Sequence, residues 1–156
     1  MTIAGEALTP GQARGTTLVL DEPISFWGGV DENTGRVIDT HHPQSGALVA
    51  GTILVLRCGR GSSSSSSVLA ECLRNGVGPA AIVLAEPDPI LALGALVAGE
   101  LYATEIPVVV LPPDAYAACS AARELTVQAD HRSMRAVVRI GGDHSPAGGP
   151  APVSRS

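Results

Sequence analysis

The residues best suited to chemistry lie in one short stretch, where Gly59-Arg60-Gly61 is followed by six serines at positions 62–67. An apolar run at 52–57 precedes the glycines, and apolar residues at helical spacing follow the serines. A turn from a strand through glycines into a helix presents unpaired backbone N–H groups, which bind phosphate or carboxylate. We therefore expect an anion-binding site here, although the G-x-G-x-x-G and G-x-S-x-G fingerprints are absent from this stretch.

The serine run itself allows two interpretations. Serine-rich segments are often flexible linkers, but a linker inside a compact domain is uncommon, and this run lies between a predicted strand and a predicted helix. We therefore predict that a helix begins within the serines and ends at Asn75-Gly76. With Ser62 as its N-cap, the Ser62 hydroxyl would accept a backbone N–H two or three residues later. Ser65 and Ser66 lie about one turn further on, and periodicity alone does not separate them as the reactive hydroxyl.

Cysteine and histidine residues give weaker signals. The three cysteines are odd in number, far apart and without a C-x-x-C spacing: Cys58, Cys72 and Cys119. We expect them to be small buried hydrophobic residues that form neither a disulfide framework nor a metal or iron–sulfur site in this chain. His41 and His42 lack a third ligand at metal spacing, so they are interpreted as surface turn residues. Asp31 is interpreted as a turn former rather than a catalytic carboxylate.

Composition excludes several functional classes. All ten basic residues are arginine, so lysine-dependent Schiff-base chemistry and the lysine of a phosphate-binding P-loop are excluded. The formal net charge is -5 and the arginines are scattered, so nucleic acid is not an expected partner. The longest apolar stretch, 89–99, is about half the ~20 residues that span a membrane, and residues 1–15 do not resemble a secretory signal. We therefore expect no membrane association and a cytoplasmic location.

The remaining pattern predicts one α/β domain over residues 1–140 and a disordered tail over 141–156. Apolar runs favour strands at 16–20, 52–57, 80–85 and 106–111, and helices at 89–101 and 113–122. Alternating residues at 125–129 and 134–140 predict a closing antiparallel hairpin. Aromatic residues make up only 3% of the chain, so its core must consist mainly of aliphatic side chains.

Two motifs together carry a family resemblance. The first is Ser25-Phe26-Trp27-Gly28-Gly29-Val30-Asp31 with Thr34-Gly35 beyond it, and the second is Gly59-Arg60-Gly61-Ser62 with Ser66 four residues on. From about Arg14 to Ile140 the chain resembles the small subunit of aconitase X. The resemblance implies a swivelling β/β/α domain, with a small central mixed sheet or barrel flanked by helices.

The resemblance also implies a function. The chain would be inactive alone and would join a large aconitase X-type subunit, which holds an iron–sulfur cluster and makes most contacts with a small carboxylate substrate. The family motif places the reactive serine four residues after the first, which selects Ser66 as the base that removes the α-proton. The residues expected to contact substrate are Gly28, Gly29, Arg60, Gly61, Ser62 and Ser65. The full serine run and Arg60 favour the bacterial substrate, cis-3-hydroxy-L-proline, over the archaeal mevalonate 5-phosphate.

A free-energy comparison indicates that such a domain holds only half of an active site. Lowering the pKa of a hydroxyl from near that of water to a working value of ~8 requires on the order of 10 kcal/mol, at ~1.36 kcal/mol per unit. A helix N-terminus supplies at most ~2 kcal/mol of this. The remainder must come from groups outside the helix or from substrate binding. The competing interpretation is a non-catalytic module, whose glycine–serine loop binds an anionic ligand in a regulatory role.

Overall fold

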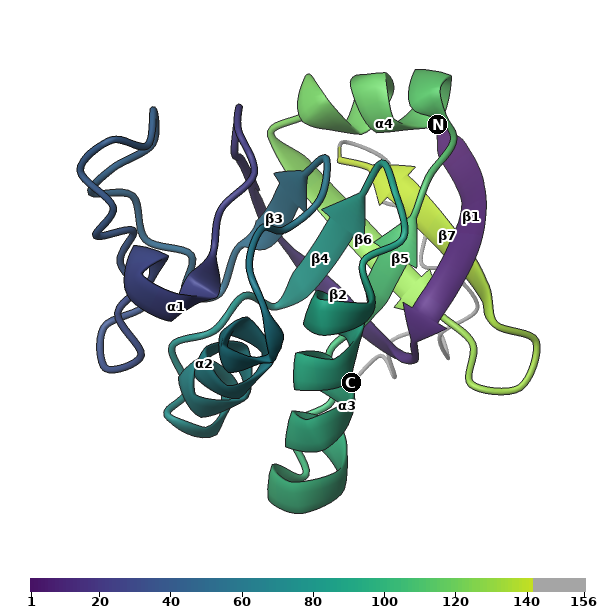
Figure 1. Cartoon of the computed structure of the whole chain (residues 1–156). Helices are drawn as coiled ribbons and strands as arrows, with labels where there is room; N and C mark the ends of the chain where they lie inside the picture. The colour runs from purple at the N-terminus through teal and green to yellow at the C-terminus, as the bar shows by residue number, and fades with distance from the viewer. Residues whose placement is uncertain (142–156) are drawn as a thin grey trace, which may run out of the picture.

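In residues 1–141, the part of the chain that the structure describes, seven strands form a closed barrel (Figure 1). The structure is a computed structural model. The strands are β1 (Thr2–Thr9), β2 (Gly11–Val19), β3 (Ile53–Leu56), β4 (Ala81–Leu84), β5 (Val108–Val110), β6 (Glu124–Ala129) and β7 (Arg135–Ile140). Their order around the barrel is β1-β5-β4-β3-β2-β6-β7. The β2–β3, β3–β4 and β4–β5 pairings are parallel and the other four are antiparallel, which confirms the small mixed barrel expected from the sequence.

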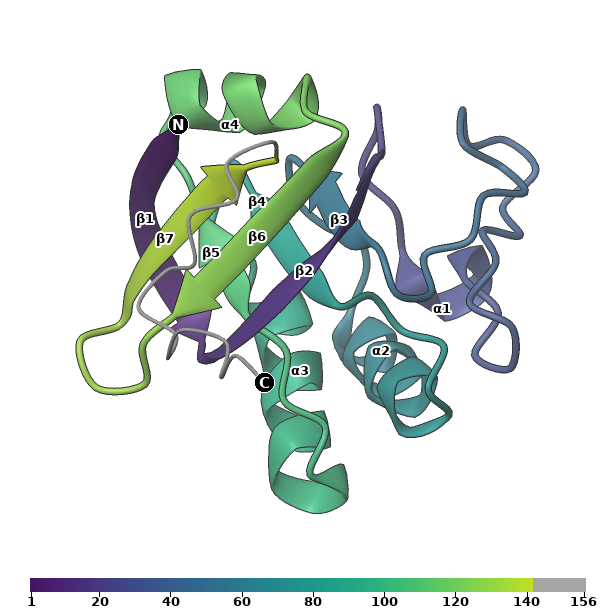
Figure 2. The ribbon, with the colours of Figure 1, turned by 180° about the vertical axis from the view of Figure 1, so that it is seen from behind.

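The described segment also contains four helices: α1 (Phe26–Gly29), α2 (Ser63–Arg74), α3 (Pro89–Tyr102) and α4 (Pro113–Ser120). α2 and α3 connect successive parallel strands and pack side by side, with α1 next to α2 (Figure 1). Seen from behind, β2, β6 and β7 form the opposite side of the barrel, and α4 crosses one of its ends (Figure 2). The serine run, which begins α2, therefore lies on the helix-covered side.

The core has two layers that share β3 and β4, in which every residue is buried. Ile53 and Val55 pack inside the barrel with Val127 of β6. Leu54 and Leu56 belong to the second layer, between the barrel and the helices. Parallel strands that are covered on both faces need apolar residues at consecutive positions, which is why these two strands are continuous apolar runs in the sequence.

The elements predicted between positions 52 and 140 are confirmed within two residues at each end. The structure differs at the N-terminus, where β1 and the first five residues of β2 were not indicated by the sequence pattern. Small residues interrupt the apolar alternation in this part of the chain, and Gly5 of β1 shows why a small residue is needed. A Cβ at Gly5 would lie 2.5 Å from Leu111 Cδ2 and 2.8 Å from the Val110 carbonyl oxygen. β1 therefore forms through close pairing with β5 and β7, not through its own apolar pattern.

Two further sequence expectations concern the ends of the chain and membranes. The expected tail lies outside the described residues from position 142 onward. Gly141, its first residue, donates its N–H to the Glu124 carbonyl oxygen at 2.7 Å. Within residues 1–141, each helix is too short or too polar to cross a membrane.

A glycine brings α2 and α3 into close contact. A Cβ at Gly94 of α3 would lie 2.8 Å from the carbonyl oxygen of Ser66 and 3.0 Å from Leu69 Cδ2, both in α2. At Gly99, further along the same helix, a Cβ would meet nothing within 4 Å. The close approach at Gly94 therefore fixes where the serine run lies against α3.

These two glycines provide a matched test of the helix contact. Gly94→Ala is expected to destabilise the fold by about 1–3 kcal/mol, because the added methyl group overpacks against the α2 backbone. Gly99→Ala is expected to stabilise it by about 0.5–1 kcal/mol, because alanine is the better helix former and has room here. Urea unfolding followed by circular dichroism measures both changes. Equal shifts for the two variants would contradict the close contact at Gly94.

Candidate functional site

The structure brings the two sequence motifs together. Residue Ile24, just before α1, forms a parallel bridge with Gly59, and the Arg60 N–H donates to the Ile24 carbonyl oxygen at 2.9 Å. The loop at 59–62, which leads from β3 into α2, therefore runs directly beside the segment that contains Ser25 and α1. The two motifs thus form a pair of adjacent loops on the helix-covered side of the barrel, and the first loop positions the second.

Ser65 connects the two loops from within α2. Its side chain is buried, and its Oγ lies 2.9 Å from the Oγ of Ser25. The Trp27 N–H also donates to Ser65 Oγ, at 3.5 Å. Gly61 must be glycine at this point, because its φ is +111° and a Cβ would lie 2.7 Å from Ser25 Oγ and 2.8 Å from Ser65 Oγ. Ser65 is therefore a bridging residue beneath the loop rather than an exposed hydroxyl.

Ser62 and Ser66 occupy contrasting positions. Ser66 is 5% exposed, and its Oγ donates to the Ile90 carbonyl oxygen of α3 at 2.9 Å. Ser62 is exposed at the N-cap position of α2. The prediction that its hydroxyl caps the helix is wrong: its side chain makes no cap hydrogen bond, and the Ser65 N–H instead bonds to the Ser62 carbonyl oxygen at 2.9 Å. The Ser62 hydroxyl is therefore left facing outward at a helix N-terminus.

Asp88 holds the loop from the other side and was missed by the sequence analysis. One carboxylate oxygen accepts the N–H groups of Ile90 and Leu91, at 2.9 and 3.1 Å, which caps α3. The other accepts the Gly59 N–H at 2.6 Å. The cap itself has a sequence signal, an aspartate followed by Pro89 at the first helical position. The bond to Gly59 has none, because it joins two different loops.

The hollow between this loop and α3 is small. It has a volume of about 30 Å³ and is lined by Gly59, Arg60, Gly61, Ser65, Asp88 and Ile90, together with Leu91. That is room for a water molecule and not for a substrate. Gly28 and Ser62, which are exposed, lie outside it, and Arg60 is exposed at its rim. Gly29, the other predicted contact in α1, is buried, and a Cβ there would lie 2.9 Å from Ile24 Cγ1. The site is thus an open edge of the domain.

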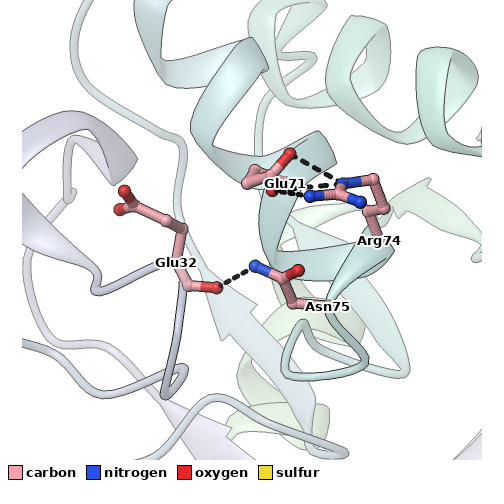
Figure 3. Close-up of polar contacts among 4 residues, drawn as sticks. All are labelled: Glu32, Glu71, Arg74 and Asn75. Carbon is pink, nitrogen blue, oxygen red and sulfur yellow. Dashed lines mark hydrogen bonds and ion pairs between the residues drawn. The ribbon is translucent and has the colours of Figure 1, made fainter.

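The segment after the first motif is fastened to the far end of α2. The Asn75 side-chain amide donates to the Glu32 carbonyl oxygen at 2.8 Å, beside the ion pair of Glu71 and Arg74 (Figure 3). Asp31 accepts the Asn33 N–H at 2.8 Å, which confirms its role in a turn. Ser65 and Asn75 therefore hold this segment at both ends of the same helix.

The two histidines differ from each other. His41 is exposed, as expected, but the expectation of a surface residue is wrong for His42, which is 6% exposed. Its Nδ1 accepts the Gln44 N–H at 3.0 Å, so its Nε2 carries the proton and donates to the Glu22 carbonyl oxygen at 2.9 Å. Both nitrogens of His42 are therefore occupied in holding the turn.

The cysteines are separate and unsuited to metal binding. Cys72 and Cys119 are buried as predicted, whereas Cys58 is partly exposed. Burial raises the pKa of Cys72 to about 12 and that of Cys119 to about 11, and iron–sulfur ligands must be thiolates. Between Met1 and Gly141, no three histidine, cysteine or acidic residues lie together in a way that could hold a metal ion. The described residues therefore do not fit an iron–sulfur cluster.

The closed mixed barrel and its glycine–serine loop define a swivelling β/β/α domain, and the crystal structure of Thermococcus kodakaraensis aconitase X (holo-form) shows the same architecture. The TM-score is 0.72 at 30% identity, covering 89% of this chain and 98% of that one. Residues 2–136 match the aconitase X swivel domain. The chain belongs to the aconitase X swivel-domain family.

Two relatives carry names that state an activity. The chain is 49% identical over 109 residues to a cis-3-hydroxy-L-proline dehydratase of Pseudomonas aeruginosa, covering 70% of this chain and 19% of that protein. It is 38% identical over 136 residues to a phosphomevalonate dehydratase small subunit of Methanothermobacter thermautotrophicus, covering 86% of this chain and 99% of that protein. The chain therefore spans about a fifth of the first relative and nearly all of the second.

The contribution of Asp88 is testable by stability. Asp88→Ala is expected to cost at least about 2 kcal/mol, because it uncaps α3 and leaves the Gly59 N–H without its partner. Asp114→Ala, at an exposed acidic residue in the first turn of α4, is the control and is expected to change stability by less than about 1 kcal/mol. Urea unfolding measures both variants. If Asp88→Ala costs no more than Asp114→Ala, the carboxylate does not hold the loop.

The cysteine environments predict selective alkylation. At about pH 8 iodoacetamide should modify Cys58 first, because Cys72 and Cys119 are buried and remain protonated until the pH approaches their raised pKa values. In urea all three should react. Peptide mass spectrometry identifies the modified residue. Equal modification of Cys58 and Cys72 in the native protein would contradict the burial of Cys72.

Proposed function

We propose that this chain is the small component of an aconitase X-type dehydratase and acts with a large subunit on cis-3-hydroxy-L-proline. The observation that carries the proposal is the exposed Ser62 hydroxyl at the N-terminus of α2, in a loop held by Asp88. The 49% identity to a protein named as that dehydratase supports the substrate. We assign the iron–sulfur cluster and most substrate contacts to the large subunit, and a cytoplasmic location to the enzyme.

The proposed reaction removes a proton and a hydroxide from neighbouring carbon atoms, which together leave as water. A serine side chain that has first lost its hydroxyl proton takes the proton from the carbon next to the carboxylate, and the C–H electron pair forms the new double bond as hydroxide leaves the next carbon. The serine then gives that proton to the hydroxide, which leaves as water. The unpaired N–H groups at the start of α2 favour an anionic group of the substrate nearby. This chain thus positions the base. Most of the free energy needed to lower the pKa of the serine hydroxyl must come from the large subunit or from substrate binding.

Ser62 suits the role of base better than Ser66. The Ser66 hydroxyl is buried and donates its proton to the Ile90 carbonyl oxygen, so its oxygen lacks an open path to a substrate. The Ser62 hydroxyl is exposed and free of a cap bond. We therefore propose Ser62 as the base and keep Ser66, which the family motif selects, as the alternative.

Mevalonate 5-phosphate is the second candidate substrate. A relative named phosphomevalonate dehydratase small subunit is matched over 99% of its length, whereas the hydroxyproline enzyme is matched over 19%. The region matched by this chain thus makes up nearly all of a relative that is named as a small subunit. The identity over the matched residues is lower, which is why this substrate ranks second.

The substrate test uses this chain co-expressed with its large subunit. We expect the complex to dehydrate cis-3-hydroxy-L-proline, and neither chain to do so alone. Turnover of mevalonate 5-phosphate instead would select the second candidate. An inactive complex, with a chain that binds phosphate tightly by itself, would favour a non-catalytic anion-binding module.

Alanine variants in the same complex identify the base. Ser62→Ala is expected to lower turnover by ~10²–10⁴ while thermal stability stays unchanged. Ser66→Ala is expected to keep most turnover but to lose about 1 kcal/mol of stability, because the bond to the Ile90 carbonyl disappears. Loss of turnover in Ser66→Ala alone, with Ser62→Ala active, would reverse the assignment.

A further inference from the structure

Trp27 is an exposed aromatic residue on a fixed turn. Its side chain is 66% exposed, although Phe26 before it is fully buried and Val30 after it is buried. The Trp27 carbonyl oxygen accepts a hydrogen bond from Ser25 Oγ at 3.0 Å, and its N–H donates to Ser65 Oγ at 3.5 Å. The backbone is therefore attached to its surroundings while the indole lies in solvent.

This turn lies at the edge of the candidate site. Ser65, which bonds to the turn, is in the first turn of α2, and Gly61 packs against both Ser25 Oγ and Ser65 Oγ. Arg60, on the same loop as Gly61, is also exposed. Trp27, Arg60 and Ser62 thus belong to two segments in direct contact.

We propose that Trp27 anchors this domain to the large subunit, so that the partner closes over Ser62; the inference rests on the proposed function. Tryptophan and arginine are the residues that most often dominate binding at interfaces, and both are exposed here. Because the Trp27 backbone is already held, docking immobilises only the indole, which has few rotamers to lose.

The large subunit is the occupant favoured by the relatives and by the site. The chain matches only 19% of the Pseudomonas aeruginosa relative, so most of that protein lies outside the matched part. The hollow beside the loop, of about 30 Å³, holds no substrate by itself. A partner that completes the site must therefore approach the edge where Trp27 and Ser62 are exposed.

Leu101 offers a matched control. Its side chain is 69% exposed, close to the value for Trp27, and it lies near the C-terminal end of α3. Asp88, the N-cap of α3, lies beside the loop, so Leu101 lies roughly 20 Å further along the helix at ~1.5 Å per residue. Truncating it removes exposed apolar surface away from the site.

The test measures the affinity of this chain for its large subunit by calorimetry, after the wild-type complex has been shown to be active. Trp27→Ala is expected to weaken binding at least about 30-fold. Truncating a hot-spot residue at an interface costs ~2 kcal/mol or more, and each ~1.4 kcal/mol changes the Kd tenfold. Leu101→Ala is expected to weaken it less than about threefold. The thermal stability of free Trp27→Ala should match wild type, because the indole is exposed. Trp27 is the chain's single tryptophan, so fluorotryptophan labelling gives one fluorine NMR resonance, which should shift on docking.

Three outcomes would overturn the inference alone. Equal weakening by Trp27→Ala and Leu101→Ala would show that the docking surface is not centred on the site. If Trp27→Ala left the affinity for the large subunit unchanged but lowered turnover, Trp27 would be a substrate contact instead. A fluorine resonance that shifts with the concentration of this chain, and not with the partner, would make a second copy the occupant. A wild-type chain that binds no large subunit would overturn the proposed function together with this inference.

Discussion

Burial of β3 and β4 on both faces is the constraint from which the site follows. Both strands are fully buried, so their outer face needs the cover that α2 and α3 provide. Because the two strands are parallel, the chain leaves both at the same edge of the barrel on its way into these helices. The loop before α2 and the loop before α3 therefore meet, and Asp88 of one reaches Gly59 of the other.

The close contacts around the 59–62 loop account for its glycines. A Cβ at Gly59 would lie 2.7 Å from the Asp88 carboxylate, and one at Gly61 would meet the oxygens of Ser25 and Ser65. The loop is thus packed on both sides, which leaves its backbone little freedom. If a partner docks as proposed, a fixed loop would present the Ser62 hydroxyl at little further entropic cost.

Under the proposed function, the domain supplies only part of a reaction site. The helix N-terminus at α2 provides unpaired N–H groups, whose effect on a nearby charge is at most ~2 kcal/mol. The loop side chains are one exposed arginine and hydroxyl groups, and the adjacent hollow is the size of a water molecule. This division fits relatives in which the matched region is a fifth of a longer protein or a separate small subunit.

The sequence by itself determined the buried parallel strands, the helix that begins among the serines and the two motifs, because each is a local pattern of apolar spacing or turn residues. Only the tertiary structure decided the rest. β1 forms by pairing with strands from the end of the chain, and His42 is buried by contacts with a distant carbonyl. Which serines are covered depends on the neighbouring elements: Gly94 and Ile90 of α3 cover Ser66, and Ser25 covers Ser65. The other four serines of the run, Ser62 among them, stay exposed. Helical periodicity places a side chain on a face, but the neighbouring elements determine whether that face is covered.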